Sequence, residues 1–166
     1  NGVHVSLTSS PIDITEAIDF INKASEGRAG GISTFIGVTR KDAHQDGEVD
    51  HLIYEAHVTM AEKKMLEVMR RKASLVTNFG MVVNRLSLKY AILSVYISHT
   101  LGRVNVGEAS IIIAAAGVHR REAIDFVSEA IDLLKAEVPV WKKEVYSGNG
   151  EEEWKENKEW HPETLR

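Results

Sequence analysis

The sequence contains no cysteine. Disulfide bonds, thiolate nucleophiles and cysteine-ligated zinc are therefore excluded for this chain. Any sulfur that takes part in its chemistry has to arrive on a substrate or on a partner. The seven histidines show no metal-ligand spacing such as HExxH, so we predict no metal site. The glycines form neither a GxGxxG nor a P-loop pattern, which argues against a nucleotide-binding fold.

The chain also lacks an excess of positive charge and a long hydrophobic run. Its 24 acidic and 20 basic residues give a net charge of −4, whereas nucleic-acid binders usually carry a basic excess. The longest apolar run, Ala109 to Val118, is far shorter than the ~20 residues that a membrane-spanning helix needs. No signal peptide is recognisable. These absences favour a cytosolic protein in which a few basic residues form a local pocket for a small anion or an acidic tail.

The composition and the periodicity indicate one folded domain. With 166 residues, 43% of them hydrophobic and 27% charged, we expect a single domain over residues 1–150 and a tail over residues 151–166 that contributes to the pocket or to a dimer. The pattern predicts strands at 3–7, 30–40, 49–57, 88–98, 109–116 and 140–146, and helices at 13–27, from 59 onward and at 121–137. We expect residues 49–57 to pair antiparallel with residues 30–40, and residues 102–107 to form a turn. This order predicts an α+β fold rather than a doubly wound parallel sheet.

Basic side chains stand at the ends of several of these elements. His119 and Arg120 follow a strand and begin a helix, where free N–H groups favour anions. Lys135 lies near the end of that helix, Lys142 lies in the strand after it, and Arg40 ends an earlier strand. Because element ends often meet, we expect these side chains to converge on one ligand. Each also has an ordinary alternative as a solvated turn, a helix-end cation, a snorkelling lysine or a surface charge.

Four stretches of the sequence resemble the large, catalytic subunit of molybdopterin synthase. They are TFIGVTR at 34–40, YEA at 54–56 before MAE at 60–62, GEASIIIAAAGVHRREAI at 107–124 and LKAEVPVWKKE at 134–144. The most specific feature is His-Arg at a strand–helix junction combined with LKxxxPxWKxE. The resemblance extends from about Ile12 to Trp160. It implies an α/β hammerhead-like core with an additional antiparallel β-sheet.

The resemblance also implies a sulfur-transfer reaction in molybdenum cofactor biosynthesis. The family converts cyclic pyranopterin monophosphate into molybdopterin by installing a dithiolene. The sulfur comes from a thiocarboxylate at the C-terminal Gly-Gly of a ubiquitin-like small subunit. The pterin is the substrate, so the resemblance implies no cofactor. Two large subunits form a central homodimer with a small subunit at each end, which makes a heterotetramer.

Two lysines carry the catalytic roles that the resemblance implies. Lys135 matches the family's essential lysine nearest the terminal glycine of the small subunit, and Lys142 matches a second lysine of the pocket. Lys135 would act as a general acid–base or as a transient acyl acceptor, activated by partial burial. Lys142 would stabilise charge on the thiocarboxylate or on a developing oxyanion.

The substrate-binding residues follow from the same resemblance. Arg40, His119 and Arg120 match residues that hold the phosphate of the pterin, with the last two reaching in from the other protomer. His119 would either bind phosphate or shuttle protons near neutral pH. Lys158 falls where the family often has a basic residue late in the chain.

The sequence departs from the family at two places and leaves two other interpretations open. Residues 74–85 look like an insertion, and His99-Thr100-Leu101-Gly102 stands where the family often has His-Arg-x-Gly. One alternative is a Schiff-base lyase that uses Lys135 on a phosphorylated carbonyl substrate. The other is a non-catalytic dimeric module that binds an acidic or Gly-Gly-ended tail.

Overall fold

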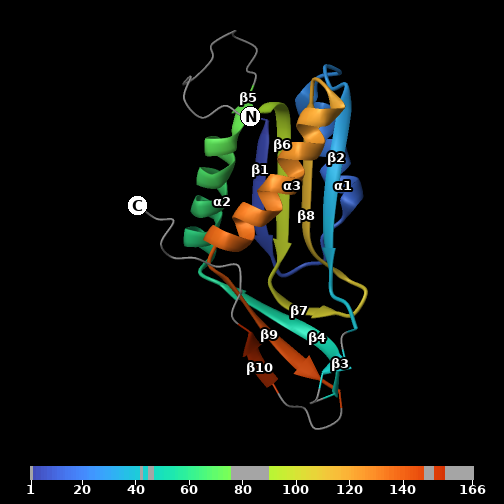
Figure 1. Ribbon diagram of the computed structural model, residues 1–166, viewed down its shortest axis with the longest axis vertical. Helices are drawn as coiled ribbons and strands as arrows, with labels where there is room; N and C mark the ends of the chain where they lie inside the picture. The colour runs from blue at the N-terminus through green and yellow to red at the C-terminus, as the bar shows by residue number, and fades with distance from the viewer. Residues whose placement is uncertain (1, 42, 45–46, 76–89, 148–151, 156–166) are drawn as a thin grey trace.

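The computed structural model describes residues 2–41, 43–44, 47–75, 90–147 and 152–155, whose strands form two sheets (Figure 1). The main sheet has the order β1-β6-β8-β2, and β5 also lies beside β6. Its strands are β1 (Val3–Thr8), β2 (Gly31–Val38), β5 (Ala73–Leu75), β6 (Tyr90–Thr100) and β8 (Ala109–Gly117). The small sheet has the order β10-β9-β4-β3, and β7 also pairs with β4. Its strands are β3 (Ala43–His44), β4 (Gly47–Ala56), β7 (Gly102–Asn105), β9 (Val140–Tyr146) and β10 (Glu152–Lys155).

Helices cover both faces of the main sheet (Figure 1). The helix α1 (Ile14–Ser25) lies on one face, and α2 (Val58–Lys72) and α3 (Arg120–Glu137) lie on the other. Successive side chains of a strand point to opposite faces, and β8 shows this directly. Its odd-numbered residues from 111 to 115 pack with α2 and α3, and its even-numbered residues from 112 to 116 pack with α1. The prediction of a central strand that is apolar on both faces is therefore confirmed.

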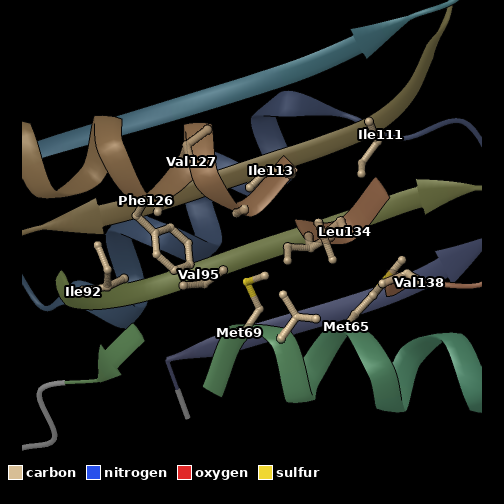
Figure 2. Packing of buried hydrophobic residues seen from close by; sticks show 14 of the residues in the cluster. Met65, Met69, Ile92, Val95, Ile111, Ile113, Phe126, Val127, Leu134 and Val138 are labelled. Carbon is tan, nitrogen blue, oxygen red and sulfur yellow. The ribbon is translucent and has the colours of Figure 1, made fainter. Parts of the chain in front are cut away.

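The larger hydrophobic core lies between α2, α3 and the main sheet (Figure 2). Phe126 of α3 is 1% exposed and sits edge-on to the ring of Tyr90, with ring centroids 6.2 Å apart. Met65 and Met69 of α2 enter the same cluster, which continues to Leu134 in the last turn of α3. This packing fixes the direction of α3 and so fixes the place where the chain turns into β9. None of the helices in the described part of the chain is long and apolar enough to cross a membrane.

Two expectations about the strands are wrong. β4 does not pair with β2 but with β9, β7 and β3, so it belongs to the small sheet. β2 pairs instead with β8, which pairs along its other edge with β6, so that the backbone of β8 is hydrogen-bonded on both sides. Residues 102–105 form β7 rather than a turn, and only the residues after them turn back toward β8. Of the suggested insertion, residues 76–85 lie outside the described part of the chain.

A buried ion pair joins α2 to the end of α3. The Nζ atom of Lys64 lies 3.3 Å from Oε2 of Glu137, and the two side chains are 14% and 4% exposed. We expect Lys64→Met to lower the free energy of unfolding by about 3 kcal/mol, because it takes the ammonium away from a buried carboxylate. Urea unfolding followed by circular dichroism measures this loss.

The neighbouring lysine provides the control for this pair. Lys63 is exposed, so Lys63→Met is expected to change the free energy of unfolding by less than about 0.5 kcal/mol. Combining Lys64→Met with Glu137→Met should recover most of the loss, since two apolar side chains replace the pair without leaving a buried charge. A double variant as unstable as Lys64→Met alone would contradict this interpretation.

Candidate active site

The His-Arg pair lies at one end of the main sheet. His119 precedes the first turn of α3, and its backbone N–H donates to Oε2 of Glu122 at 3.2 Å. Arg120 begins the helix directly over Gly31 of β2, where an added Cβ would come within 2.8 Å of the Arg120 Cα atom. Glycine at position 31 thus allows the helix to begin this close to the strand. Both His119 and Arg120 are exposed, which leaves their side chains accessible to an anion.

Arg40 lies at the opposite end of the same sheet. β2 runs from Gly31, beneath Arg120, to Val38, and Arg40 follows two residues later with an exposed side chain. A strand of this length separates its two ends by about 25 Å. Within a single chain, Arg40 therefore does not meet the His-Arg pair, which the family resemblance assigns to the other protomer. Arg40 and the His-Arg pair can meet only if the latter comes from another copy.

The two lysines flank one turn. α3 ends at Glu137, the N–H of Val138 caps it by donating to the Leu134 carbonyl oxygen at 3.0 Å, and β9 begins at Val140. Lys135 lies in the last turn of the helix, and Lys142 is the third residue of the strand. The two lysines therefore lie on the two sides of one helix–strand junction. Lys135 is exposed rather than partly buried in the single chain, so the expected activation by burial is wrong for this state.

The Lys142 ammonium is held from its own strand. Its Nζ atom lies 3.3 Å from Oε1 of Glu144, and the Tyr146 hydroxyl donates to Oε2 of the same carboxylate at 2.8 Å. These alternate residues share one face of β9. Lys143 points to the other face, where its Nζ atom lies 5.0 Å from the centroid of the Trp154 ring. The two adjacent lysines therefore serve different surfaces, as strand geometry predicts.

An edge-on ring contact beside Lys142 joins the two sheets. Tyr54 of β4 stands opposite Lys142 in the β4–β9 register, and its ring meets the His99 ring edge-on at 4.8 Å between centroids. Burial raises the pKa of the Tyr54 hydroxyl, and a hydrogen bond with Ser110 partly offsets this shift. The Ser110 hydroxyl donates to the Gly37 carbonyl oxygen at 3.2 Å. Side chains of β4, β6 and β8 thus meet beside Lys142, where the two sheets adjoin.

His99 is neutral at this contact between the two sheets. Burial lowers its pKa from 6.5 to about 4, against the opposing effect of the hydrogen bond to Thr100. That bond joins Nδ1 to the Thr100 carbonyl oxygen at 2.8 Å. A carbonyl oxygen only accepts, so the proton of the neutral ring resides on Nδ1. Sequence analysis assigned no role to His99, Ser110, Glu144 or Tyr146.

The lowered pKa of His99 predicts acid sensitivity. Between pH 6.5 and about 4 the unfolded chain protonates this histidine whereas the folded chain does not. Stability therefore falls as the pH falls through this window, by about 3 kcal/mol in total, and the group contributes nothing above it. Urea unfolding at several pH values should show a shallower dependence for His99→Gln. The same substitution at the exposed His57 serves as the control, and equal slopes for all three proteins would contradict the assignment.

The remaining predicted sites are a metal site, which the sequence argues against, and the C-terminal tail. Among the described residues, no group of three or more His, Asp or Glu side chains is arranged to hold a metal ion. Lys158 lies outside the described part of the chain. Of the predicted tail, residues 152–155 form β10 and extend the small sheet beside β9.

Comparison with known proteins gives the family. A family model described as "MoaE protein" matches residues 7–137. The chain belongs to the MoaE family. The molybdopterin synthase catalytic subunit of Drosophila melanogaster is 44% identical over 156 residues, which are 94% of this chain and 38% of that protein. The molybdopterin synthase catalytic subunit of Arabidopsis thaliana is 38% identical over 165 residues, which are 99% of this chain and 73% of that protein.

The lengths of these relatives differ. This MoaE-family chain spans only 38% of the Drosophila melanogaster protein but 73% of the Arabidopsis thaliana protein.

Solved structures share the MoaE fold. The crystal structure of molybdopterin synthase from Staphylococcus aureus has a TM-score of 0.70 at 22% identity, covering 91% of this chain and 96% of that one. A chain in the complex of subunits 1 and 2 of molybdopterin-converting factor from Helicobacter pylori has a TM-score of 0.64 at 16% identity, covering 98% of this chain and 94% of that one. Identities this low establish the fold alone. The predicted α+β fold is thereby confirmed.

Proposed function

We propose that this MoaE-family chain is the large subunit of a molybdopterin synthase, a sulfurtransferase of molybdenum cofactor biosynthesis. The observation that carries the proposal is the α3–β9 junction, where LKAEVPVWKKE places Lys135 and Lys142 on the two sides of one turn. The chain is 44% identical to a protein named molybdopterin synthase catalytic subunit, which supports the same assignment. The substrate is cyclic pyranopterin monophosphate, and the product is the molybdopterin dithiolene.

The two lysines divide the chemistry of sulfur transfer. Two sulfurs are transferred, each from the terminal glycine of a small-subunit tail. Each sulfur forms a bond to a pterin side-chain carbon as a C–O bond of that carbon breaks, and the displaced oxygen stays on the phosphate or leaves as water. Water also cleaves each acyl–sulfur bond and returns the tail as a carboxylate. Lys142 neutralises the thiocarboxylate or the developing oxyanion, because a fixed ammonium stabilises negative charge. Lys135 moves protons or accepts the acyl group. The chemistry as proposed uses no bound cofactor and no metal.

The partner is a ubiquitin-like small subunit with a C-terminal Gly-Gly thiocarboxylate. The relative from Helicobacter pylori is described as a complex of two subunits of molybdopterin-converting factor, which supports a partner of this kind. The tail reaches the α3–β9 junction, where Lys135 and Lys142 provide the positive charge for its anionic end. We place this reaction in the cytosol.

A homodimer through β2 would complete the phosphate site. β2 is the outermost strand of the described main sheet, and Ile32, Ile36 and Val38 on it are 38%, 40% and 51% exposed. An unpaired strand edge with apolar side chains is a natural template for pairing with a second copy. Antiparallel pairing about a two-fold axis sets the Gly31 end of one β2 beside the Val38 end of the other. His119 and Arg120 of one copy then approach Arg40 of the second copy.

A single-turnover assay tests the proposed function. The chain is mixed with a thiocarboxylated small subunit and cyclic pyranopterin monophosphate, and the dithiolene product and the mass of the small subunit are measured. We expect product, with the small subunit returned as a carboxylate. A small subunit that ends in an ordinary carboxylate is the matched control and should give no product.

The alternatives predict other outcomes in the same assay. A folded chain that binds the small subunit without turnover would be a binding module, and the sulfurtransferase proposal would be abandoned. A covalent adduct trapped by borohydride with a phosphorylated carbonyl substrate, and without any small subunit, would instead indicate a Schiff-base lyase.

A further inference from the structure

Tyr146 connects the core of the small sheet to Lys142. Its ring is 2% exposed and clusters with Val49 and Leu52 of β4. Its hydroxyl donates to Oε2 of Glu144 at 2.8 Å, and Oε1 of that carboxylate lies 3.3 Å from the Lys142 Nζ atom. One carboxylate thus links a buried hydroxyl to an ammonium whose side chain is 39% exposed.

The buried end of this connection supplies the rigidity. A lysine ammonium sits on a flexible four-carbon chain and can adopt many positions. An exposed ion pair alone restricts it only weakly. Glu144 is only 12% exposed on its side chain, and the Tyr146 hydroxyl occupies one of its two oxygens. Because the ring is buried against Val49 and Leu52, its hydroxyl is held in place and favours one orientation of the carboxylate. The other oxygen then offers a fixed position to the Lys142 ammonium.

We propose that Tyr146 is a positioning residue: through Glu144, its hydroxyl fixes the position of the Lys142 ammonium. The inference rests on the proposed function for its catalytic consequence, but the hydrogen-bonded connection stands on the geometry alone. Tyr146 contacts no substrate in this role. Its hydroxyl sets where the Lys142 ammonium is held, and so sets how well that ammonium meets the charge of the thiocarboxylate tail.

The test is Tyr146→Phe, which keeps the ring and removes the hydroxyl. We expect the single-turnover rate at saturating pterin to fall by about tenfold, because small misplacements of a catalytic group are costly. The affinity for the small subunit and the pterin concentration at half-maximal rate should stay unchanged. Tyr90→Phe is the matched control, since the Tyr90 hydroxyl also donates to a glutamate, Glu129, at 2.9 Å but at the far end of β6. Its rate should equal that of the parent.

A double variant shows whether Tyr146 acts through Glu144. Glu144→Gln alone should lower the rate, and adding Tyr146→Phe to it should produce no further loss, because two residues in one connection are not additive. Independent losses that multiply would overturn the proposal. Equal losses in Tyr146→Phe and Tyr90→Phe would also overturn it, since a general structural effect would then explain both.

A readout without turnover separates this inference from the proposed function. In ¹⁵N-labelled protein, the Lys142 Nζ resonance, assigned with Lys142→Arg, should shift and its proton exchange should accelerate in Tyr146→Phe but not in Tyr90→Phe. If the parent chain showed no turnover, the proposed function would be wrong. The Lys142 resonance would still show whether Tyr146 positions Lys142 through Glu144. An unchanged Lys142 resonance in Tyr146→Phe would overturn the positioning role.

Discussion

Lys135→Ala is expected to lower the single-turnover rate of dithiolene formation by about 100-fold or more, the usual range for losing a group that transfers protons. The fold should be unaffected, because the Lys135 side chain is exposed in the last turn of α3 and lies outside the hydrophobic core. The loss should therefore appear in the rate and not in the free energy of unfolding. Rapid quench with detection of the dithiolene measures the rate, and urea unfolding measures the stability.

A second helix-end lysine supplies the matched control. Lys23 is an exposed lysine in the last turn of α1, on the other face of the main sheet. Lys23→Ala removes the same charge from the same kind of helix position, so any effect of helix-end electrostatics is shared by both variants. We expect the Lys23→Ala rate to match the parent. A Lys135→Ala protein that turns over as fast as Lys23→Ala would remove Lys135 from the mechanism.

The elements that position the lysines were predictable from local sequence. α3 spans Arg120–Glu137, against a prediction of 121–137, because its apolar residues recur at helical spacing and Pro139 prevents its continuation. β8 and β9 likewise fall at their predicted places. Periodicity and proline act over a few residues, so the turn between Lys135 and Lys142 follows from the sequence without knowledge of the rest of the fold.

The pairing of strands was less predictable. Residues 49–57 were predicted as a strand, but a local strand pattern does not specify a pairing partner. The chain pairs β4 with β9, which lies more than eighty residues later, rather than with the preceding β2. The contact of Tyr54 with His99 depends on that long-range choice. Both residues lie in stretches compared with the family, YEA at 54–56 and His99-Thr100-Leu101-Gly102. Neither stretch indicates that the two side chains meet, so their contact became visible only with the two sheets in place.

The basic residues show a related limit. Sequence identified the right kinds of side chain for an anion, but β2 separates Arg40 from the His-Arg pair by its whole length. A sequence pattern says nothing about which copy of a chain supplies each residue. The resemblance to the large subunit of molybdopterin synthase supplied that part of the hypothesis, and the single-chain geometry makes it testable.

If two copies share each phosphate site as proposed, activity will depend on whether two arginine substitutions lie on different chains of the dimer or on the same chain. Arg40→Ala and Arg120→Ala are both exposed-side-chain changes, and alanine keeps the Cβ atom that packs over Gly31. When one chain carries Arg40→Ala and its partner carries Arg120→Ala, one site of the dimer keeps both arginines and the other loses both. Such a dimer should have about half the parent activity. Each variant as a homodimer should have little, because every phosphate site then lacks an arginine.

Placing both substitutions on the same chain provides the decisive comparison. A dimer of the Arg40→Ala/Arg120→Ala chain with an unaltered chain has the same composition, but each of its sites lacks one arginine, so its activity should fall to that of the single-variant homodimers. If each site were built within one chain, the results would exchange: the doubly substituted arrangement would keep about half the activity and the divided one would lose it. Two different affinity tags, one on each chain, allow both mixed dimers to be purified for the single-turnover assay. Because both mixed dimers carry the same two changes, a difference in stability or expression cannot produce this reversal, and the outcome depends only on which chain supplies Arg120 to Arg40.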